Sequence, residues 1–309
     1  MFIRNRLRLA LLSVVTVFSP AKINLLLAVT GQRADGFHEL VSVVTKMDFG
    51  DEIRAEESSI QNSGSSRFTL ECDAVGVPVD ASNLVLRAAE AYAQATGWGG
   101  RVHFKLTKRI PVGAGLGGGS SNAVAALRAL DRLAKTSLPA AKLADMVAGL
   151  GSDCPLFLHE GPVVMRGRGE RIELLPLTAR ARLSGRRVLV FKPSFGIATA
   201  WAYQRMVSRG TDYVPAGEAE RRLAEWVSSD APAEHLLANN MEAVAFEKYV
   251  GLPALLETLR QEFGLVPRMS GSGSACFALL GAKQAAEPII ARIRDCWGAE
   301  TFAIVTRLV

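Results

Sequence analysis

Cysteine is scarce in this chain of 309 residues, which contains only Cys72, Cys154, Cys276 and Cys296. These four residues lie far apart and form no CxxC pair, so the sequence indicates neither a zinc site nor a disulfide framework. A reducing, cytoplasmic environment is the simplest interpretation.

The apolar run near the amino terminus is too short to span a bilayer. Arg4, Arg6 and Arg8 precede apolar residues 9–18, a pattern that superficially resembles a signal peptide, but no small-residue cleavage site follows it. We therefore interpret residues 1–13 as an extension ahead of the first strand and expect no membrane partner.

No concentrated basic run accompanies the net charge of +6 and the pI near 9.3. Because lysine and arginine are spread along the chain, the sequence shows no footprint for nucleic acid. Anionic small molecules fit this charge, as does a basic surface without a specific partner. A hydrophobic content of 49% is enough for one large domain or about two ordinary ones.

The order of predicted elements indicates an α+β protein with two lobes. Residues 23–30 are β-branched and apolar and predict a buried strand, followed by a turn at Asp35-Gly36 and a strand at 40–47. Residues 58–66 predict an exposed loop, and a soft boundary between the lobes falls at 178–186. Further strands are predicted at 67–72, 101–110, 187–192, 275–280 and 301–308, and helices at 84–95, 120–135, 139–150, 216–228, 252–263 and 285–297.

The most informative stretch is residues 111–122, which contains five glycines and leads directly into the helix predicted at 120–135. Glycine lets the backbone approach a phosphate closely and adopt positive φ, so successive N–H groups can converge on its oxygens. The amino terminus of the helix adds free N–H groups and the positive end of its dipole. The stretch therefore predicts a polyphosphate-binding loop.

Three other interpretations of this loop are open. A dinucleotide-binding GxGxxG motif would follow the first strand of a βαβ unit, whereas several predicted strands precede Gly113. A Walker P-loop needs a lysine after its last glycine, where this chain has Ser120. A purely structural turn would not need five glycines.

The string Pro-x-Gly-x-Gly-Leu-Gly-Gly-Gly-Ser-Ser-Asn at 111–122 resembles the phosphate-binding motif of the GHMP kinases, a superfamily that includes galactokinase, homoserine kinase and mevalonate kinase. The resemblance implies an amino-terminal ATP-binding lobe (14–180) and a ferredoxin-like carboxyl-terminal lobe (181–309), with the active site between them. It implies ATP and Mg²⁺ as cofactors, with Ser120 or Ser121 at the metal, and Asn83 and Lys108 near the adenine. The implied ATP-binding residues are Asn83, Lys108, Pro111, Gly113, Gly115, Leu116, Gly117, Gly118, Gly119, Ser120 and Ser121.

Lys22 and Asp153 are the candidate catalytic residues. Lys22 and Asn24 are two apart on a predicted strand and point to the same face. Taken alone, Lys22 fits a surface lysine at a strand edge, and Asp153 fits a capping or turn aspartate after a helix. However, Ser-Pro-Ala-Lys-Ile-Asn-Leu at 19–25 and Leu-Gly-Ser-Asp-x-Pro at 150–155 resemble two signatures of the 4-diphosphocytidyl-2-C-methyl-D-erythritol kinase family.

That resemblance implies that Asp153 is the general base and that Lys22 is its charged partner. An ammonium beside a carboxylate favours the ionised form and can polarise an attacking hydroxyl. The glycine loop and the metal would hold the γ-phosphoryl group in line with that hydroxyl.

Residues 33–40, which include Arg33, Asp35, Gly36, Phe37 and His38, resemble the segment of this family that receives a cytosine ring. An aromatic face that stacks and an imidazole that hydrogen-bonds suit a flat, polar heterocycle. Many relatives have Tyr where this chain has Phe37, so stacking is kept without a phenolic hydrogen bond. Without the resemblance, Phe37 fits a hairpin core and His38 an ordinary surface residue.

Two further segments resemble the family. Tyr203 aligns with its second stacking ring, although a core role fits this tyrosine equally well. Residues 269–277 resemble its carboxyl-terminal motif, which suits an anionic substrate tail, whereas a Gly-Ser turn before a strand is the plain alternative. Residues 239–242 match without an assigned role. The implied substrate-binding residues are Asn24, Phe37, His38, Asp153, Tyr203, Gly271 and Ser272.

The matching segments occur in order and cover both lobes. They imply an ATP-dependent kinase that phosphorylates the 2-hydroxyl of 4-diphosphocytidyl-2-C-methyl-D-erythritol, giving the 2-phosphate and ADP, in the non-mevalonate route to isopentenyl diphosphate. The alternatives are a GHMP kinase for homoserine or mevalonate, or a catalytically silent nucleotide-binding regulator, which the presence of both Lys22 and Asp153 disfavours. We expect a small-molecule partner with a cytidine diphosphate moiety, no nucleic acid, and a monomer or weak homodimer.

Overall fold

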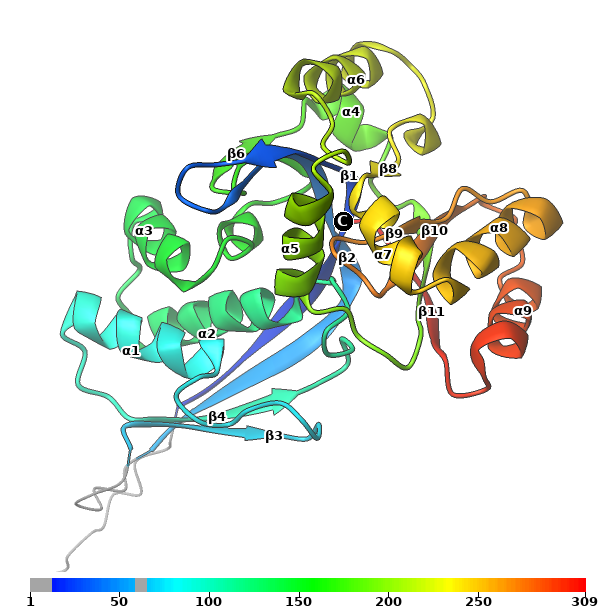
Figure 1. Cartoon of the computed structure of the whole chain (residues 1–309). Coiled ribbons are helices and arrows are strands. Elements are labelled where there is room, and N and C mark those ends of the chain that lie inside the picture. The colour runs from blue at the N-terminus through cyan, green and yellow to red at the C-terminus, as the bar shows by residue number, and fades with distance from the viewer. Residues whose placement is uncertain (1–12, 59–65) are drawn as a thin grey trace, which may run out of the picture.

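A computed structural model describes residues 13–58 and 66–309, which form two β-sheets flanked by helices (Figure 1). The first sheet contains β1 (Val14–Gln32), β2 (His38–Glu57), β3 (Phe68–Cys72), β4 (Val102–Thr107), β5 (Val163–Gly167), β6 (Arg171–Leu174) and β8 (Ala238–Asn239). The second sheet contains β7 (Arg187–Lys192), β9 (Arg268–Met269), β10 (Cys276–Leu280) and β11 (Phe302–Arg307). The predicted α+β class with two lobes is confirmed.

In the first sheet the strand order is β3-β4-β2-β1-β8, with β5 paired to β2 and β6 paired to β5. Strands β1 and β2 form its long antiparallel centre and extend beyond the predicted 23–30 and 40–47. The end of the apolar run at 9–18 belongs to β1, where Val17 is buried while its neighbours Thr16 and Phe18 are exposed. That alternation is typical of a half-buried strand.

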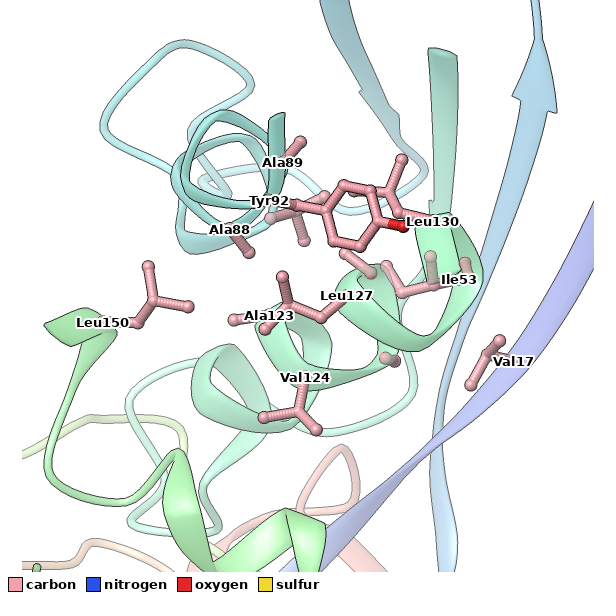
Figure 2. Close-up of a cluster of buried hydrophobic side chains, with 14 of the residues drawn as sticks. Val17, Ile53, Ala88, Ala89, Tyr92, Ala123, Val124, Leu127, Leu130 and Leu150 are labelled. Carbon is pink, nitrogen blue, oxygen red and sulfur yellow. The ribbon is translucent and has the colours of Figure 1, made fainter. Parts of the chain in front are cut away.

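Three helices that were predicted, α1 (Leu84–Thr96), α2 (Gly118–Ala134) and α3 (Ala140–Leu150), lie on one side of the first sheet (Figure 1). Figure 2 shows Leu127 and Leu130 of α2 between Tyr92 of α1 and Ile53 of β2. All four side chains are fully buried. This packing holds the amino terminus of α2 in a fixed place, and the predicted glycine loop ends there.

The second sheet has the strand order β11-β7-β10-β9. Leucines and isoleucines of α8 (Gly251–Phe263) and α9 (Glu287–Trp297) pack on the face that carries Phe191 and Ala278. Helix α6 (Ala216–Ser228) begins and ends where it was predicted. Several short elements were not predicted from the sequence: α4 (Leu177–Ala181), α5 (Thr199–Arg209), α7 (Met241–Lys248), β5, β6, β8 and β9.

The two lobes share one hydrophobic core. Val190 and Phe277, on the opposite face of the second sheet, belong to the same buried cluster as Ile23 and Leu25 of β1. Strand β8 also pairs in parallel with β1, so the second half of the chain adds a strand to the first sheet. The lobes are therefore joined around β1, which carries Lys22 and Asn24.

The carboxyl terminus returns to the middle of the molecule (Figure 1). There the backbone N–H of Val309 donates to the carbonyl of Lys46 on β2. The predicted extension at 1–13 lies outside the described residues except for Ser13, and most of the predicted loop at 58–66 also lies outside them. Among the helices of residues 13–58 and 66–309, none has the length and apolar character to cross a bilayer.

Candidate active site

A cavity of about 510 Å³ is lined by residues of both lobes, a size typical of small-molecule sites. Most of the residues expected in the site line it. These are Lys22, Asn24, Asn83, Lys108, Pro111, Gly113, Gly115, Leu116, Gly117, Gly118, Gly119, Ser120, Asp153, Tyr203, Gly271 and Ser272. Phe37, His38 and Ser121 are not among the lining residues.

The glycine loop connects β4 to α2. At two of its positions the backbone conformation and the close neighbours both require glycine. Gly115 and Gly117 have φ of 74° and 72°, in the left-handed region that other residues rarely adopt. A Cβ on Gly115 would collide with the carbonyl oxygen of Ser270. A Cβ on Gly117 would lie 2.8 Å from Cγ of Lys22. The loop is therefore packed closely against the catalytic strand and the third glycine segment.

The loop leads into the amino terminus of α2, where Gly117 is the N-cap residue. The first N–H groups of a helix have no partner within the helix, and together with its dipole they favour bound anions. Ser120 lies in this first turn and lines the cavity. This end of the cavity is therefore suited to phosphate.

Lys22 and Asp153 meet in the cavity as an ion pair, with Nζ 3.5 Å from Oδ2. The lysine side chain is 5% exposed and that of the aspartate 42%. Lys22 is held by a hydrogen bond from its backbone N–H to the carbonyl of Leu116 and by one from Nζ to Oδ1 of Asn24, 2.7 Å away. The Asp153 carboxylate is thus partly exposed, whereas the Lys22 ammonium is buried and held by hydrogen bonds.

Asn24 connects Lys22 to β2 and to the third glycine segment. Its Nδ2 donates to Oγ of Ser42 at 2.9 Å, and its backbone N–H donates to Oγ of Ser270 at 3.4 Å. The Ser270 hydroxyl in turn donates to the carbonyl of Gly115. The catalytic strand, the glycine loop and residues 270–274 are thereby held in one network.

Residues 239–242 hold the third glycine segment from the other side. Nδ2 of Asn239 donates to the carbonyls of Met269 and Gly271, each at 2.8 Å. The Glu242 carboxylate accepts from the backbone N–H of Met269 at 2.8 Å. Residues 239–242, to which the family resemblance assigned no role, therefore support the third glycine segment.

The aromatic residues expected at the substrate end lie beside the cavity rather than all within it. The rings of His38 and Tyr203 have centroids 4.6 Å apart, and of the two only Tyr203 lines the cavity. Phe37 is 47% exposed and stacks under the guanidinium of Arg168, 4.8 Å from its ring centroid. Arg168 itself lines the cavity, so it connects Phe37 to the cavity wall.

Burial shifts the pKa of three groups near the site. It raises the pKa of Tyr203 to about 12, with a further contribution from the negative charge of Asp153. It raises the pKa of the Cys154 thiol to about 11, so this neighbour of Asp153 is not a thiolate at neutral pH. It lowers the pKa of His38, whose Nε2 is buried without a hydrogen-bond partner among the described residues.

Three of the expected ATP-binding residues also have contacts that the sequence did not predict. Ser121 is buried and its hydroxyl accepts from Ser19, so only Ser120 of the two serines faces the cavity. Asn83 lines the cavity and caps α1 through its side chain. Lys108 forms a buried ion pair with Asp51, and its Nζ lies 3.2 Å from where a Cβ of Gly118 would stand. Its ammonium is therefore at the amino terminus of α2.

Two family models match this chain. The model described as "GHMP kinases N terminal domain" matches residues 83–161, which include the glycine loop and Asp153. The model described as "GHMP kinases C terminal" matches residues 219–299, which include the third glycine segment.

Relatives extend the match to nearly the whole chain. The 4-diphosphocytidyl-2-C-methyl-D-erythritol kinase of Synechococcus sp. (strain CC9902) is 38% identical over 86% of this chain and 88% of its own length. The protein of the same name from Rhizobium etli (strain ATCC 51251) is 35% identical over 91% of this chain and 90% of its own length. The chain belongs to the GHMP kinase family.

Solved structures agree with this GHMP kinase assignment. A crystal structure of 4-(cytidine 5'-diphospho)-2C-methyl-D-erythritol kinase has a TM-score of 0.73 and 32% identity, covering 95% of this chain and 99% of that chain. The Methanococcus jannaschii mevalonate kinase has a TM-score of 0.71 at 12% identity, covering 96% of this chain and 99% of that one. The second likeness shows the fold alone. Membership of the family implies that the protein uses ATP.

In this GHMP kinase three residues at or beside the site were not predicted from the sequence: Ser42, Asp51 and Arg168. Ser42 and Arg168 line the cavity, and Asp51 lies fully buried behind the glycine loop. No local pattern marks them, because each is one polar residue in or beside a strand.

Proposed function

We propose that the protein transfers the γ-phosphoryl group of ATP to the 2-hydroxyl of 4-diphosphocytidyl-2-C-methyl-D-erythritol, giving the 2-phosphate and ADP, in the non-mevalonate route to isopentenyl diphosphate. One observation carries the proposal: the Lys22–Asp153 pair faces the same cavity as the glycine loop and Tyr203. A phosphoryl donor and an acceptor alcohol bound in that cavity would meet at the pair. The full-length relatives that carry the name of this kinase support the choice of acceptor.

The glycine loop and the first turn of α2 bind the triphosphate in this proposal. Residues 113–120 line this end of the cavity, and the free N–H groups at a helix amino terminus favour bound anions. Phosphoryl transfer needs little covalent work from a protein, so positioning and charge stabilisation account for most of the catalysis.

Asp153 accepts the proton of the acceptor hydroxyl, and Lys22 stabilises the negative charge that develops beside it. The geometry favours this division of roles because the Asp153 side chain is partly exposed, whereas the Lys22 side chain is buried and its Nζ donates to Asn24. A fixed ammonium costs little reorganisation when charge develops.

Mg²⁺ fits the residues at the phosphate end. No group of three His, Cys, Asp or Glu side chains that could hold a metal by itself occurs in the described part of the chain. Mg²⁺ prefers oxygen ligands and usually binds through one or two protein groups together with substrate phosphates. Of the two serines expected at the metal, Ser120 lines the cavity and offers a hydroxyl, and the bound metal would supply positive charge to the β- and γ-phosphates.

The cytidine end of the acceptor is placed at Phe37, His38 and Tyr203. Phe37 and Tyr203 provide ring faces, and Nε2 of His38, which has no hydrogen-bond partner in the described part of the chain, provides a hydrogen-bonding group for the base edge. Arg168 lies over Phe37 and lines the cavity, where its charge suits the diphosphate. Gly271 and Ser272 close the site from the second lobe.

The organisation proposed for the chain follows the same reasoning. Residues 14–180 form the ATP-binding domain and residues 181–309 the carboxyl-terminal substrate domain, while β8 of the latter reaches into the first sheet. A cytoplasmic monomer or weak homodimer, acting without nucleic acid or membrane, is part of the same proposal.

The test is release of ADP from Mg-ATP with a panel of acceptors. The panel contains 4-diphosphocytidyl-2-C-methyl-D-erythritol, methylerythritol phosphate, mevalonate, homoserine and galactose. We expect turnover with the first alone. Turnover with mevalonate or homoserine would overturn the acceptor but keep the kinase, and ATP binding without any turnover would favour a regulator.

A further inference from the structure

Asp51 is a fully buried carboxylate beside the two ends of the glycine loop, and it does not itself line the cavity. It stands on β2 opposite Ser19 of β1, with 0% of its surface exposed. A buried carboxylate is costly unless it is paired and hydrogen-bonded. Asp51 has four donors around it, which is the capacity of a carboxylate.

The two carboxylate oxygens of Asp51 accept hydrogen bonds from different segments of the chain. Oδ1 accepts from the backbone N–H groups of Arg109 at 2.7 Å and Ile110 at 2.8 Å, directly before the glycine loop. Oδ2 accepts from the ammonium of Lys108 and from Nδ2 of Asn122 at 2.9 Å, in the first turns of α2. One side chain therefore holds the residues before and after the loop.

Asn122 extends this network to β1. Its Nδ2 also donates to Oγ of Ser19 at 2.8 Å, and the Ser19 hydroxyl donates to Oγ of Ser121 at the same distance. Ser19 precedes Lys22 on the same strand, so the start of α2 is fixed relative to the catalytic strand through buried hydrogen bonds.

The ion pair also places the charge of Lys108. Nζ lies 3.2 Å from the position that a Cβ of Gly118 would take, and Lys108 lines the cavity although its side chain is only 8% exposed. Asp51 thus holds an ammonium where the free N–H groups of α2 point. Both features attract phosphate oxygens.

We propose that Asp51 is the positioning residue of the phosphate-binding loop: its carboxylate sets the distance between the two ends of the loop and holds the Lys108 ammonium at the amino terminus of α2. Its task is nucleotide binding rather than stability alone. Buried ion pairs are weak sources of stability, and apolar side chains of similar volume often replace them without loss. The inference rests on the proposed function only through the binding of ATP.

The variant Asp51→Asn separates the two halves of this network. Its amide oxygen still accepts from the N–H groups of Arg109 and Ile110, whereas its NH₂ group replaces Oδ2 and faces the donors of Lys108 and Asn122. We expect the Kd for Mg-ADP, measured by isothermal titration, to rise about tenfold or more. The affinity for cytidine diphosphate at the acceptor end should stay within twofold of the wild-type value.

Lys108→Met and the double variant Asp51→Asn/Lys108→Met complete a cycle. If both residues act through one ion pair, their effects on the Kd for ADP will not multiply, and the double variant will lie within about twofold of the weaker single variant. Independent, multiplying effects would contradict the proposal.

Leu259→Ala is the control for loss of stability. Leu259 is fully buried in α8, which packs on the second sheet and contributes no residue to the lining of the cavity, so the variant should lower the Tm while leaving the Kd for ADP unchanged. If Asp51→Asn lowers the Tm but binds ADP within twofold of the wild type, Asp51 is merely structural and the proposal is wrong. Should Asp51→Asn fail to fold, Asn122→Ala tests the same oxygen, with a rise in Kd expected and an unchanged Kd contradicting the proposal. A wild-type protein that turns over another acceptor would leave this inference intact.

Discussion

The ammonium nitrogen of Lys22 lies 3.5 Å from Oδ2 of Asp153, and the two residues come from opposite ends of the first lobe's sequence. Lys22 is buried in the middle of β1, and Asp153 follows the carboxyl end of α3. The glycine loop separates them along the chain and lies against Lys22 at Gly117. Three sequence segments thus converge on the place where a phosphoryl group would be transferred.

Asp153→Asn should lower kcat by about 10²–10⁴-fold with little change in either KM, because a carboxamide cannot take up the proton of the acceptor hydroxyl. Lys22→Met should act in the same direction. Steady-state assays of ADP release measure both effects. Asp145→Asn, an exposed change on α3, is the control and should leave kcat unchanged. A rise in KM with an unaltered kcat in Asp153→Asn would show that this residue binds substrate instead of accepting the proton.

Gly115→Ala should raise the KM for ATP strongly and lower the Tm, because the new Cβ would collide with the carbonyl of Ser270 and the backbone has φ of 74°. The left-handed conformation alone costs a residue with a side chain about 1–2 kcal/mol. Gly217→Ala, in open space within α6, is the matched control and should raise stability by about 0.5–1 kcal/mol. Thermal melting and ATP titrations would test the pair, and equal behaviour of the two variants would contradict the close packing of the loop.

Tyr203→Ala should weaken binding of the cytidine-containing acceptor about tenfold or more, since stacking on a base contributes about 1–3 kcal/mol per base. Tyr203→Phe keeps the ring and should bind nearly as the wild type does. Acceptor KM values at saturating ATP distinguish the two variants. Similar losses in both would indicate that the hydroxyl, and not the ring, is what the acceptor needs.

Arg168→Met should also raise the acceptor KM while leaving the KM for ATP unchanged, because the guanidinium stacks on Phe37 and lines the cavity. Arg221→Met removes an exposed arginine that pairs with Glu225 on α6, and it serves as the control. An Arg168→Met enzyme with wild-type acceptor KM would place the diphosphate elsewhere.

Stability should fall as the pH drops below about 6.5, the ordinary pKa of histidine. Burial lowers the pKa of both His38 and His159 in the folded protein. Between the unfolded and folded pKa values the unfolded chain binds more protons, so protonation favours unfolding as the pH falls through this window. Tm measurements from pH 7.5 to 5 should show the decline. His38→Gln should make it shallower, and an unchanged slope would exclude His38 as a contributor.

The sequence alone determined the family, the helices α1, α2, α3, α6, α8 and α9, and the glycine loop. These features depend on local patterns: apolar residues at helical spacing, and glycines whose backbone freedom needs no distant partner. Strand β7 was also predicted correctly, because its run of apolar and β-branched residues is a local pattern too. The short elements α7, β8 and β9 were missed because their few residues carry too little pattern, and contacts with other segments stabilise them.

Only the tertiary structure determined which polar residues of the site line the cavity and which are buried beside it. Ser120 and Ser121 are equivalent in the sequence, but the turn of α2 points one into the cavity and the other toward Ser19. Asp51 and Arg168 have no motif of their own. Their positions depend on strand pairing and on packing between distant segments, which is why the Asp51–Lys108 pair became visible only when β2 and the glycine loop were placed side by side.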